Sequence, residues 1–242
     1  MTVLVVRGDR EFLVDPGEEF GTDLGVLEVP EDVEPGDTIT THLDEEFEVR
    51  RLRSPDLFHH MERTGAPMMP RDIGLIAGHV GVQAGDRVLD AGTGTGVLSA
   101  YFGRMGAEVT TFEQKEEFAE VARGNMDLAG VTDQVDVHAG DVTEEIERDD
   151  LGEFDVLTLD TQDAPAVVAH APDMLVDGGF LAVYSPFVEN SRDVVEAARE
   201  AGLSHIETQE TIQREMDFDE RGSRPSTKGV GHTGYLTFAR DV

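Results

Sequence analysis

Short apolar runs alternate with polar turns along the chain, and their spacing changes near residue 55. In the first part, four β-like runs are separated by Gly, Pro and Asp. These runs are Val3–Val6, Glu11–Val14, Gly25–Val29 and Phe47–Leu52. Ser54 precedes Pro55, and a residue before proline favours extended backbone. The pattern therefore predicts a small N-terminal β domain over residues 1–55.

From residue 56 to residue 242, short strand-like runs alternate with helical segments. Two segments, Lys115–Leu128 and Asn190–Ala201, carry apolar residues at helical spacing and are followed by a glycine stop signal. Alternation of strands with helices favours a parallel sheet that is covered on both faces. The predicted strands are Arg87–Ala91, Ala107–Glu113, Gln134–His138, Phe154–Asp160 and Gly179–Ser185.

The first of these strands leads into a glycine-rich turn. The turn reads Asp90-Ala91-Gly92-Thr93-Gly94-Thr95-Gly96, and the helical segment Val97–Met105 follows it. Glycines allow a tight turn that brings the backbone close to a ligand, and ligands of parallel sheets bind beyond the carboxyl ends of the strands. Dinucleotide folds use G-x-G-x-x-G, but position 97 is Val. The pattern instead resembles the first motif of class I S-adenosylmethionine-dependent methyltransferases, which implies a Rossmann-like α/β domain.

Acidic residues follow the next two strands at the same predicted edge. Glu113 ends the second strand, where a carboxylate can accept hydrogen bonds from both ribose hydroxyls of a nucleoside cofactor. Asp141 follows the third strand, where this fold usually contacts the adenine amino group. The predicted ligands of S-adenosylmethionine at this edge are Asp90, Gly92, Thr93, Gly94, Thr95, Gly96, Glu113 and Asp141.

Other chemistries lack their motifs. The chain has no G-x-x-x-x-G-K-[ST] phosphate loop, no H-E-x-x-H metal helix and no G-x-S-x-G nucleophile elbow. It contains no cysteine, so disulfides and thiolate metal sites are excluded. The eight histidines are scattered, and no metal site is expected.

Charge is the most unusual feature of the composition. The 242 residues include 51 acidic and 19 basic side chains, which gives a formal net charge of −32. At about 1 M ionic strength the Debye length falls to roughly 3 Å, so such self-repulsion is screened. We therefore expect a halophilic source, with an ordinary acidic protein as the alternative. No apolar stretch has the length of a membrane span, and we expect a soluble, cytoplasmic protein without a membrane partner.

Several separated segments resemble one family, the tRNA adenine-58 N1-methyltransferases. The resemblance covers nearly the whole chain and implies methyl transfer to N1 of an adenine in the T-loop of tRNA, by a homotetramer in prokaryotic members. The segments that carry it are Arg7–Val14, Phe20–Gly25, Met69–Gly74, Asp90–Gly96, Leu159–Asp160 and Val230–Leu236.

The resemblance also implies site residues. Asp160 matches the catalytic strand end, where a carboxylate can accept a hydrogen bond from the adenine N6 amino group and stabilise the charge that N1 alkylation creates. Pro70 and Asp72 are predicted cofactor neighbours. Two departures concern the substrate base: no tryptophan follows Asp160, and Met69 stands where relatives commonly carry a polar or aromatic residue.

An acidic protein that binds RNA still needs cations for the phosphates. The stretch Arg221–Arg240 contains no acidic residue, and it supplies the predicted tRNA contacts Arg221, Arg224 and Lys228. A second small cluster consists of Arg50, Arg51 and Arg53. In part of the stretch Arg221–Arg240, a buried final strand would explain the absence of acidic residues without any role in RNA binding.

Two rival functions remain open at this point. One is a methyltransferase of the same fold that acts on a small molecule, such as a tetrapyrrole precursor. The other is a non-catalytic tRNA-binding subunit, which would have no chemical need for the glycine turn, Glu113 and Asp160 together.

Overall fold

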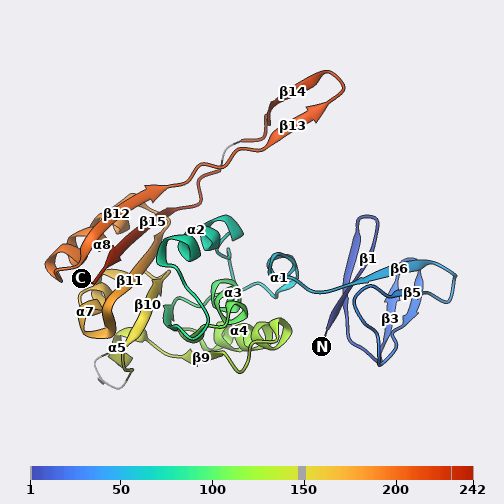
Figure 1. Cartoon of the computed structure of the whole chain (residues 1–242), viewed down its shortest axis with the longest axis horizontal. Coiled ribbons are helices and arrows are strands. Elements are labelled where there is room, and N and C mark those ends of the chain that lie inside the picture. Colours follow the sequence, from blue (N-terminus) through green and yellow to red (C-terminus); the bar gives the residue numbers. More distant parts are fainter. Residues whose placement is uncertain (1, 147–150, 230, 242) are drawn as a thin grey trace.

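The protein is represented by a computed structural model that describes residues 2–146, 151–229 and 231–241. A small β domain and a larger α/β domain follow one another along the chain, and a β-hairpin projects from the larger domain (Figure 1). No described helix is long and apolar enough to cross a membrane.

The N-terminal domain has its own apolar core. Four strands form an antiparallel sheet in the order β2-β1-β6-β5, and β3 pairs with β4. Phe47, Leu27 and Val5 are fully buried at its centre. The strands are β1 (Val3–Arg7), β2 (Arg10–Val14), β3 (Glu19–Thr22), β4 (Gly25–Glu28), β5 (Thr38–Thr40) and β6 (Glu46–Arg50).

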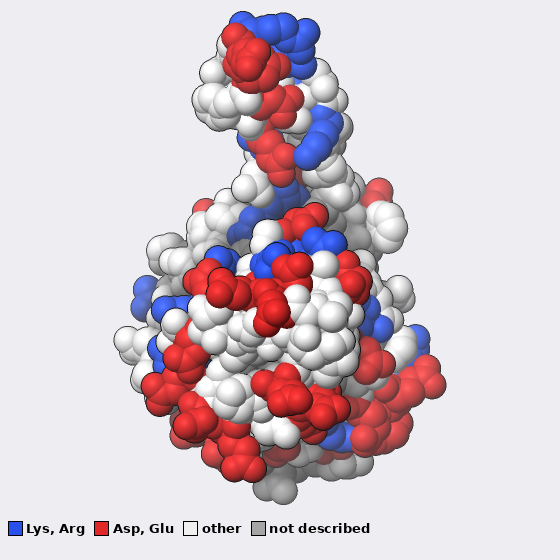
Figure 2. Space-filling view, turned by 90° about the vertical axis from the view of Figure 1, so that its right-hand side faces the viewer, with Lys and Arg blue, Asp and Glu red and all other residues white. Residues whose placement is uncertain are grey.

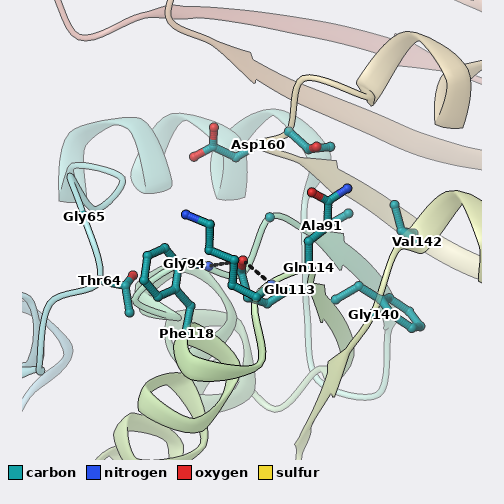
Figure 3. A pocket seen from close by; sticks show the side chains of 14 residues that line it. Thr64, Gly65, Ala91, Gly94, Glu113, Gln114, Phe118, Gly140, Val142 and Asp160 are labelled. Atoms are coloured by element: carbon teal, nitrogen blue, oxygen red, sulfur yellow. Dashed lines mark hydrogen bonds between the residues drawn. The ribbon is translucent and has the colours of Figure 1, made fainter.

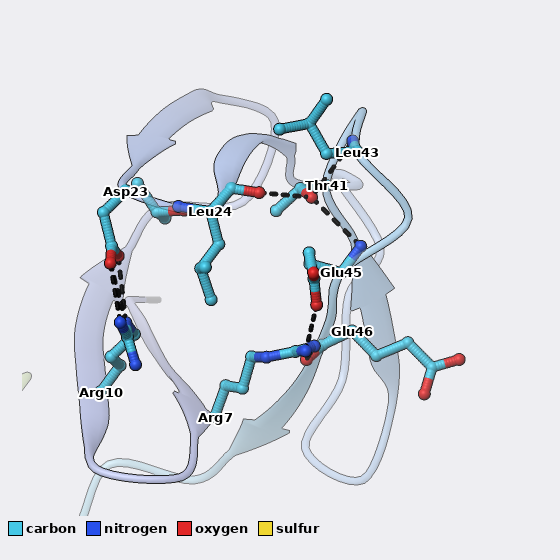
Figure 4. Close-up of polar contacts among 9 residues, drawn as sticks. Arg7, Arg10, Asp23, Leu24, Thr41, Leu43, Glu45 and Glu46 are labelled. Atoms are coloured by element: carbon cyan, nitrogen blue, oxygen red, sulfur yellow. Dashed lines mark hydrogen bonds and ion pairs between the residues drawn. The ribbon is translucent and has the colours of Figure 1, made fainter.

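Polar contacts close the rim of this domain (Figure 4). Arg10 donates two hydrogen bonds to the Asp23 carboxylate, from Nε at 3.1 Å and from Nη2 at 2.8 Å. Arg7 pairs with Glu45 and donates to the Glu46 carbonyl at 2.9 Å. The arginines that face this rim are thus held by carboxylates of the same domain.

The α/β domain is built on a seven-stranded sheet with the order β12-β15-β11-β10-β7-β8-β9. The five strands from β11 to β9 are parallel, whereas β15 runs antiparallel to both of its neighbours. The strands are β7 (Arg87–Ala91), β8 (Glu108–Glu113), β9 (Val135–Ala139), β10 (Phe154–Leu159), β11 (Leu175–Ser185), β12 (Ser204–Glu210) and β15 (Tyr235–Arg240).

Helices cover both faces, because neighbouring residues of a strand point to opposite sides. On β7, for example, Val88 packs into the core beneath α1 to α4, and Leu89 packs into the core beneath α6 to α8. The helices are α1 (Ser54–His60), α2 (Pro70–Val80), α3 (Val97–Met105), α4 (Glu116–Ala129), α5 (Val142–Ile146), α6 (Ala164–Val168), α7 (Ala171–Met174) and α8 (Val188–Glu200).

The central elements agree with the sequence pattern, and the C-terminal part differs from it. The strand over 87–91 and the helix over 97–105 have the expected bounds. An all-parallel sheet was expected, but the last strand enters antiparallel next to β11. The hairpin of β13 (Met216–Asp219) and β14 (Gly222–Pro225) was not expected, because its strands bury almost nothing and so lack apolar alternation.

Candidate active site

A pocket of about 250 Å³ opens where β7, β8 and β10 end (Figure 3). The glycine turn, the end of β8 and the residues after β9 and β10 form its walls, and Phe118 of α4 adds an aromatic side. A smaller hollow of about 40 Å³ adjoins it under Pro67 and Met68. Lining residues of the main pocket include Thr64, Gly65, Gly92, Gly94, Glu113, Gln114, Lys115, Phe118, Gly140, Asp160 and Thr161.

The glycine turn is pressed against the end of β10. Gly92 has φ +91°, and a Cβ atom at this position would lie 2.1 Å from the carbonyl oxygen of Asp160. The Asp160 amide donates to the Ala91 carbonyl at 2.8 Å, which fixes this contact from the other side. A larger residue at position 92 would therefore displace Asp160 as well as strain the turn.

The two threonines of the turn face the protein. Thr93 Oγ1 lies 2.6 Å from Thr111 Oγ1, and Thr95 Oγ1 accepts from the Thr64 amide at 3.4 Å. Buried Asn125 donates 2.8 Å to the Thr95 carbonyl and 2.9 Å to the Glu62 carbonyl. The turn can thus offer its backbone to a ligand while its side chains anchor it.

Glu113 ends β8 beside the turn, as expected. Its Oε2 accepts from the Gly94 amide at 3.0 Å, and its Oε1 accepts from the Lys115 amide at 3.1 Å (Figure 3). A carboxylate has about four acceptor positions, so two remain for hydroxyl donors in the pocket. The two amides hold the carboxylate in one orientation.

Asp90 is buried and fully engaged within the protein. Its carboxylate accepts from Ser99 at 2.7 Å, from Thr111 at 2.8 Å and from Thr158 at 2.7 Å. Burial raises its pKa, while the three hydroxyl donors act in the opposite direction. This geometry gives Asp90 the task of joining β7, β8, β10 and α3 beneath the turn.

Asp141 lies between Gly140 and Val142, which line the pocket. Its Oδ1 accepts from the Thr143 hydroxyl at 2.7 Å, and these bonds lower the pKa of the carboxyl. Gln114 donates to Asp141 at 3.0 Å and to Asp163 at 3.1 Å. Gln114 was missed in the sequence, where a polar residue just after a strand carries no distinctive signal.

Asp160 faces the pocket without a hydrogen-bond partner for its carboxylate among the described residues. Figure 3 shows it across the pocket from Phe118. Burial, with a smaller effect of the nearby Asp90 charge, raises its pKa from 3.8 to about 7. The carboxylate is thus poised between its two protonation states near neutral pH.

A second polar group lies next to Asp160 and joins distant parts of the chain. Arg71 at the start of α2 donates to Thr233 Oγ1 at 2.6 Å, and the Tyr184 hydroxyl of β11 donates to the Thr233 carbonyl. Gly234 is required here, since a Cβ would lie 2.5 Å from the Tyr184 ring. Burial, then Asp160 and Asp72, raise the pKa of Tyr184 to about 12.

Pro70 and Asp72 belong to the same part of the molecule. Pro70 occupies the first turn of α2, a position where its missing N–H costs nothing. Asp72 is buried, its Oδ2 has no hydrogen-bond partner, and burial raises the pKa of the carboxyl. The segment before the glycine motif and the C-terminal signature therefore meet beside Asp160, although Val230 of that signature lies outside the described residues.

The predicted tRNA contacts lie on the projecting hairpin and on the segment after it. Arg221 Nη2 is 3.4 Å from Asp219, and Lys228 Nζ is 3.4 Å from Glu215. Arg224 pairs in register with Asp217 of β13. The acid-free stretch of sequence thus folds against an acidic strand, which partly neutralises it.

No group of three or more His, Asp or Glu residues arranged for a metal exists in the described ranges.

The parallel strands, the glycine turn at the end of β7 and the acid at the end of β8 define a class I methyltransferase. Crystal structures agree with this class. A SAM-dependent O-methyltransferase from Thermotoga maritima matches with a TM-score of 0.82 and 28% identity, covering 100% of this chain and 92% of that one.

The sequence pattern of the family described as "tRNA methyltransferase complex GCD14 subunit" matches residues 55–221, and the chain belongs to this family. A relative from Methanocaldococcus jannaschii, named tRNA (adenine(57)-N(1)/adenine(58)-N(1))-methyltransferase TrmI, is 34% identical over 97% of this chain and 92% of its own length. The tRNA (m1A58) methyltransferase TrmI from Aquifex aeolicus matches with a TM-score of 0.76 and 25% identity, covering 100% of this chain and 97% of that one. The chain is a methyltransferase.

Proposed function

We propose that the protein transfers a methyl group from S-adenosylmethionine to N1 of an adenine in the T-loop of tRNA, at position 58. Family membership and the named activity of the Methanocaldococcus relative support this substrate over a small molecule. The observation that carries the proposal is the unpaired Asp160 carboxylate at the floor of the pocket, next to the glycine turn.

The residues of the pocket fit the cofactor. Glu113 has acceptor positions left for a ribose, and Gly94 and Gln114 line the pocket. Gln114 also donates to Asp141, so the two lie where an adenine amino group could be recognised. The bound cofactor would supply an electrophilic methyl group on a sulfonium. Thr93, Thr95 and Asp90 would act by holding the turn, and Pro70 and Asp72 by shaping the wall beside it.

Asp160 acts on the target base. It accepts a hydrogen bond from the N6 amino group and so stabilises the positive charge that spreads there when N1 becomes alkylated. With a pKa of about 7 it can also take the N6 proton. Pro67 and Met68 lie beside Asp160, and the Met68 thioether can pack against the edge of a purine ring in place of the missing tryptophan.

Mass spectrometry of nucleosides tests the proposal. Unmodified tRNA transcript is incubated with the protein and S-adenosylmethionine in concentrated KCl, then digested. We expect 1-methyladenosine, and its loss when adenine 58 of the transcript is replaced by guanine. Methylation of another base or atom would contradict the proposal.

We further propose a halophilic, cytoplasmic setting and a homotetramer. The net charge of −32 supports the first, because unscreened self-repulsion destabilises a compact chain. The melting temperature should therefore climb steeply between dilute buffer and molar KCl, and a flat response would contradict the halophilic reading. Light scattering in the same buffers measures the assembly.

A further inference from the structure

A groove of about 600 Å³ separates the N-terminal domain from the α/β domain. One wall is formed by the start of β1, by loop residues of the N-terminal domain and by residues 51–53, which link β6 to α1; the ends of α3 and α4 form the other. Three arginines of this groove come from both sides: Arg51 and Arg53 from the linker, and Arg104 from α3.

These three side chains are close enough to repel one another. Burial lowers the pKa of Arg104, and the charges of Arg51 and Arg53 lower it further. Arg104 Nη2 donates to the Leu52 carbonyl at 2.8 Å, while its buried Nη1 has no hydrogen-bond partner. Like charges gathered in this way destabilise the protein unless an anion joins them.

Carboxylates of the chain do not fill this role. Among the described residues, Arg51, Arg53 and Arg104 make no ion pair within 4.0 Å. Asp56 acts on Arg104 at longer range, but its Oδ2 is held by the Arg53 amide at 2.6 Å, and Glu31 lines the groove without pairing. Three arginines thus share one groove with no carboxylate of the described residues within ion-pair distance of any of them.

Several basic side chains outside the groove are held by carboxylates. Arg7, Arg10 and Arg50 are paired with carboxylates, and so are Arg221 and Lys228 near the hairpin. Figure 2 shows the consequence at the projecting hairpin, where basic and acidic side chains lie side by side. Favourable interaction with a helix dipole can explain the position of only one groove arginine, because only Arg104 lies in the last turn of a helix.

We propose that this groove binds phosphates of the tRNA backbone, an inference that rests on the proposed function. Its position suits that role, since the chain runs from Arg53 through α1 along α3 to Thr64 and Gly65 in the active-site pocket. Helix α3 spans about 13 Å between the glycine turn and Arg104. A strand that rises roughly 3.4 Å per nucleotide covers this span in about four nucleotides. A strand held at both places is fixed in its orientation on the protein.

The test measures affinity of the full-length protein for unmodified tRNA transcript across a KCl series, by fluorescence anisotropy. For the variant Arg51→Gln/Arg53→Gln we expect the slope of log affinity against log salt to become shallower by about 2, one unit for each lost phosphate contact. The KM for tRNA should rise, while the kcat and the affinity for S-adenosylmethionine should stay unchanged.

Two further variants separate the possible causes. Arg51→Lys/Arg53→Lys keeps the charges and should keep the slope, whereas Arg192→Gln/Arg199→Gln on exposed positions of α8 removes two charges elsewhere and should leave the slope unchanged. An unchanged slope in the groove glutamine variant, with methylation of tRNA by the unaltered protein, overturns the groove inference alone. A protein that neither binds nor methylates tRNA overturns the proposed function as well.

Discussion

Asp90 in β7 and Asp160 just after the neighbouring strand β10 are close enough to interact electrostatically, yet they have opposite surroundings. Asp90 receives three hydroxyl donors, whereas Asp160, one strand away, receives none from the described residues. The first arrangement satisfies a carboxylate in order to hold four elements together. The second leaves a carboxylate unsatisfied at the floor of a pocket, which costs stability and creates an acceptor for a ligand.

The variant Asp160→Asn changes the aspartate of this pair whose carboxylate has no hydrogen-bond partner among the described residues. The amide keeps the size but cannot take a proton or stabilise a developing cation as well, so we expect single-turnover methylation to fall by about 100-fold or more. Cofactor affinity, measured by calorimetry, should change little and serves as the control. A rate within about tenfold of the unaltered protein, a barrier change of only roughly 1.4 kcal/mol, would mean that Asp160 is not catalytic.

Glu113→Ala tests a carboxylate that is partly satisfied. Its remaining acceptor positions are proposed to bind the ribose, so affinity for S-adenosylmethionine should fall by about 1.5–3 kcal/mol, the range for hydrogen bonds to a charged group. Calorimetry measures the change, and Glu116→Ala, at an exposed position of the same region, is the matched control. Unchanged affinity would remove Glu113 from the site.

The pH dependence of kcat/KM sharpens the comparison further. Because the pKa of Asp160 is raised to about 7, the rate should fall about tenfold for each pH unit well below that value and level off above it. Asp160→Asn should abolish this dependence. A profile that is flat between pH 5 and 8 would show that the carboxylate titrates far lower, as an ordinary aspartate does.

Loss of the two carboxylates should affect stability differently, because three hydrogen bonds partly offset the desolvation of Asp90 and none from the described residues offsets that of Asp160. Asp90→Asn weakens three buried hydrogen bonds, so the free energy of unfolding should fall by about 1–3 kcal/mol in urea titrations at pH 8. For Asp160 the folded pKa lies above the unfolded one, so its contribution to stability is full below about pH 4 and is lost as the pH rises through about 7. Asp160→Asn should therefore stabilise the protein at pH 8, and two losses of equal size would contradict the comparison.

Much of the site was predictable from the sequence because its residues lie at or just after the ends of parallel strands. Gly92, Gly94, Glu113 and Asp160 line one pocket for this reason, and Asp141 accepts a hydrogen bond from the lining residue Gln114. Fold class followed from the same alternation. The positions of these residues along the chain were enough, since parallel strands share one carboxyl edge.

Contacts between distant segments could not be predicted. Tyr184 looks like any aromatic residue of an apolar strand until Thr233 and Gly234 are placed against it by the antiparallel entry of β15. The same holds for charge. Arg221, in an acid-free stretch of sequence, forms an ion pair with Asp219 of the neighbouring acidic strand. Arg104 comes close to Arg51 only because the two domains pack against each other.

The contact between Gly92 and the Asp160 carbonyl makes two motifs, 68 residues apart in sequence, into one mechanical part. In a saturation library, position 92 should tolerate no substitution, and its variants should be scored as catalytic failures even where the cofactor still binds. Efforts to reshape the cofactor pocket for an altered methyl donor should therefore leave this glycine in place. They should vary Thr64, Gln114 or Phe118 instead, because these side chains line the pocket and do not contact the Asp160 backbone.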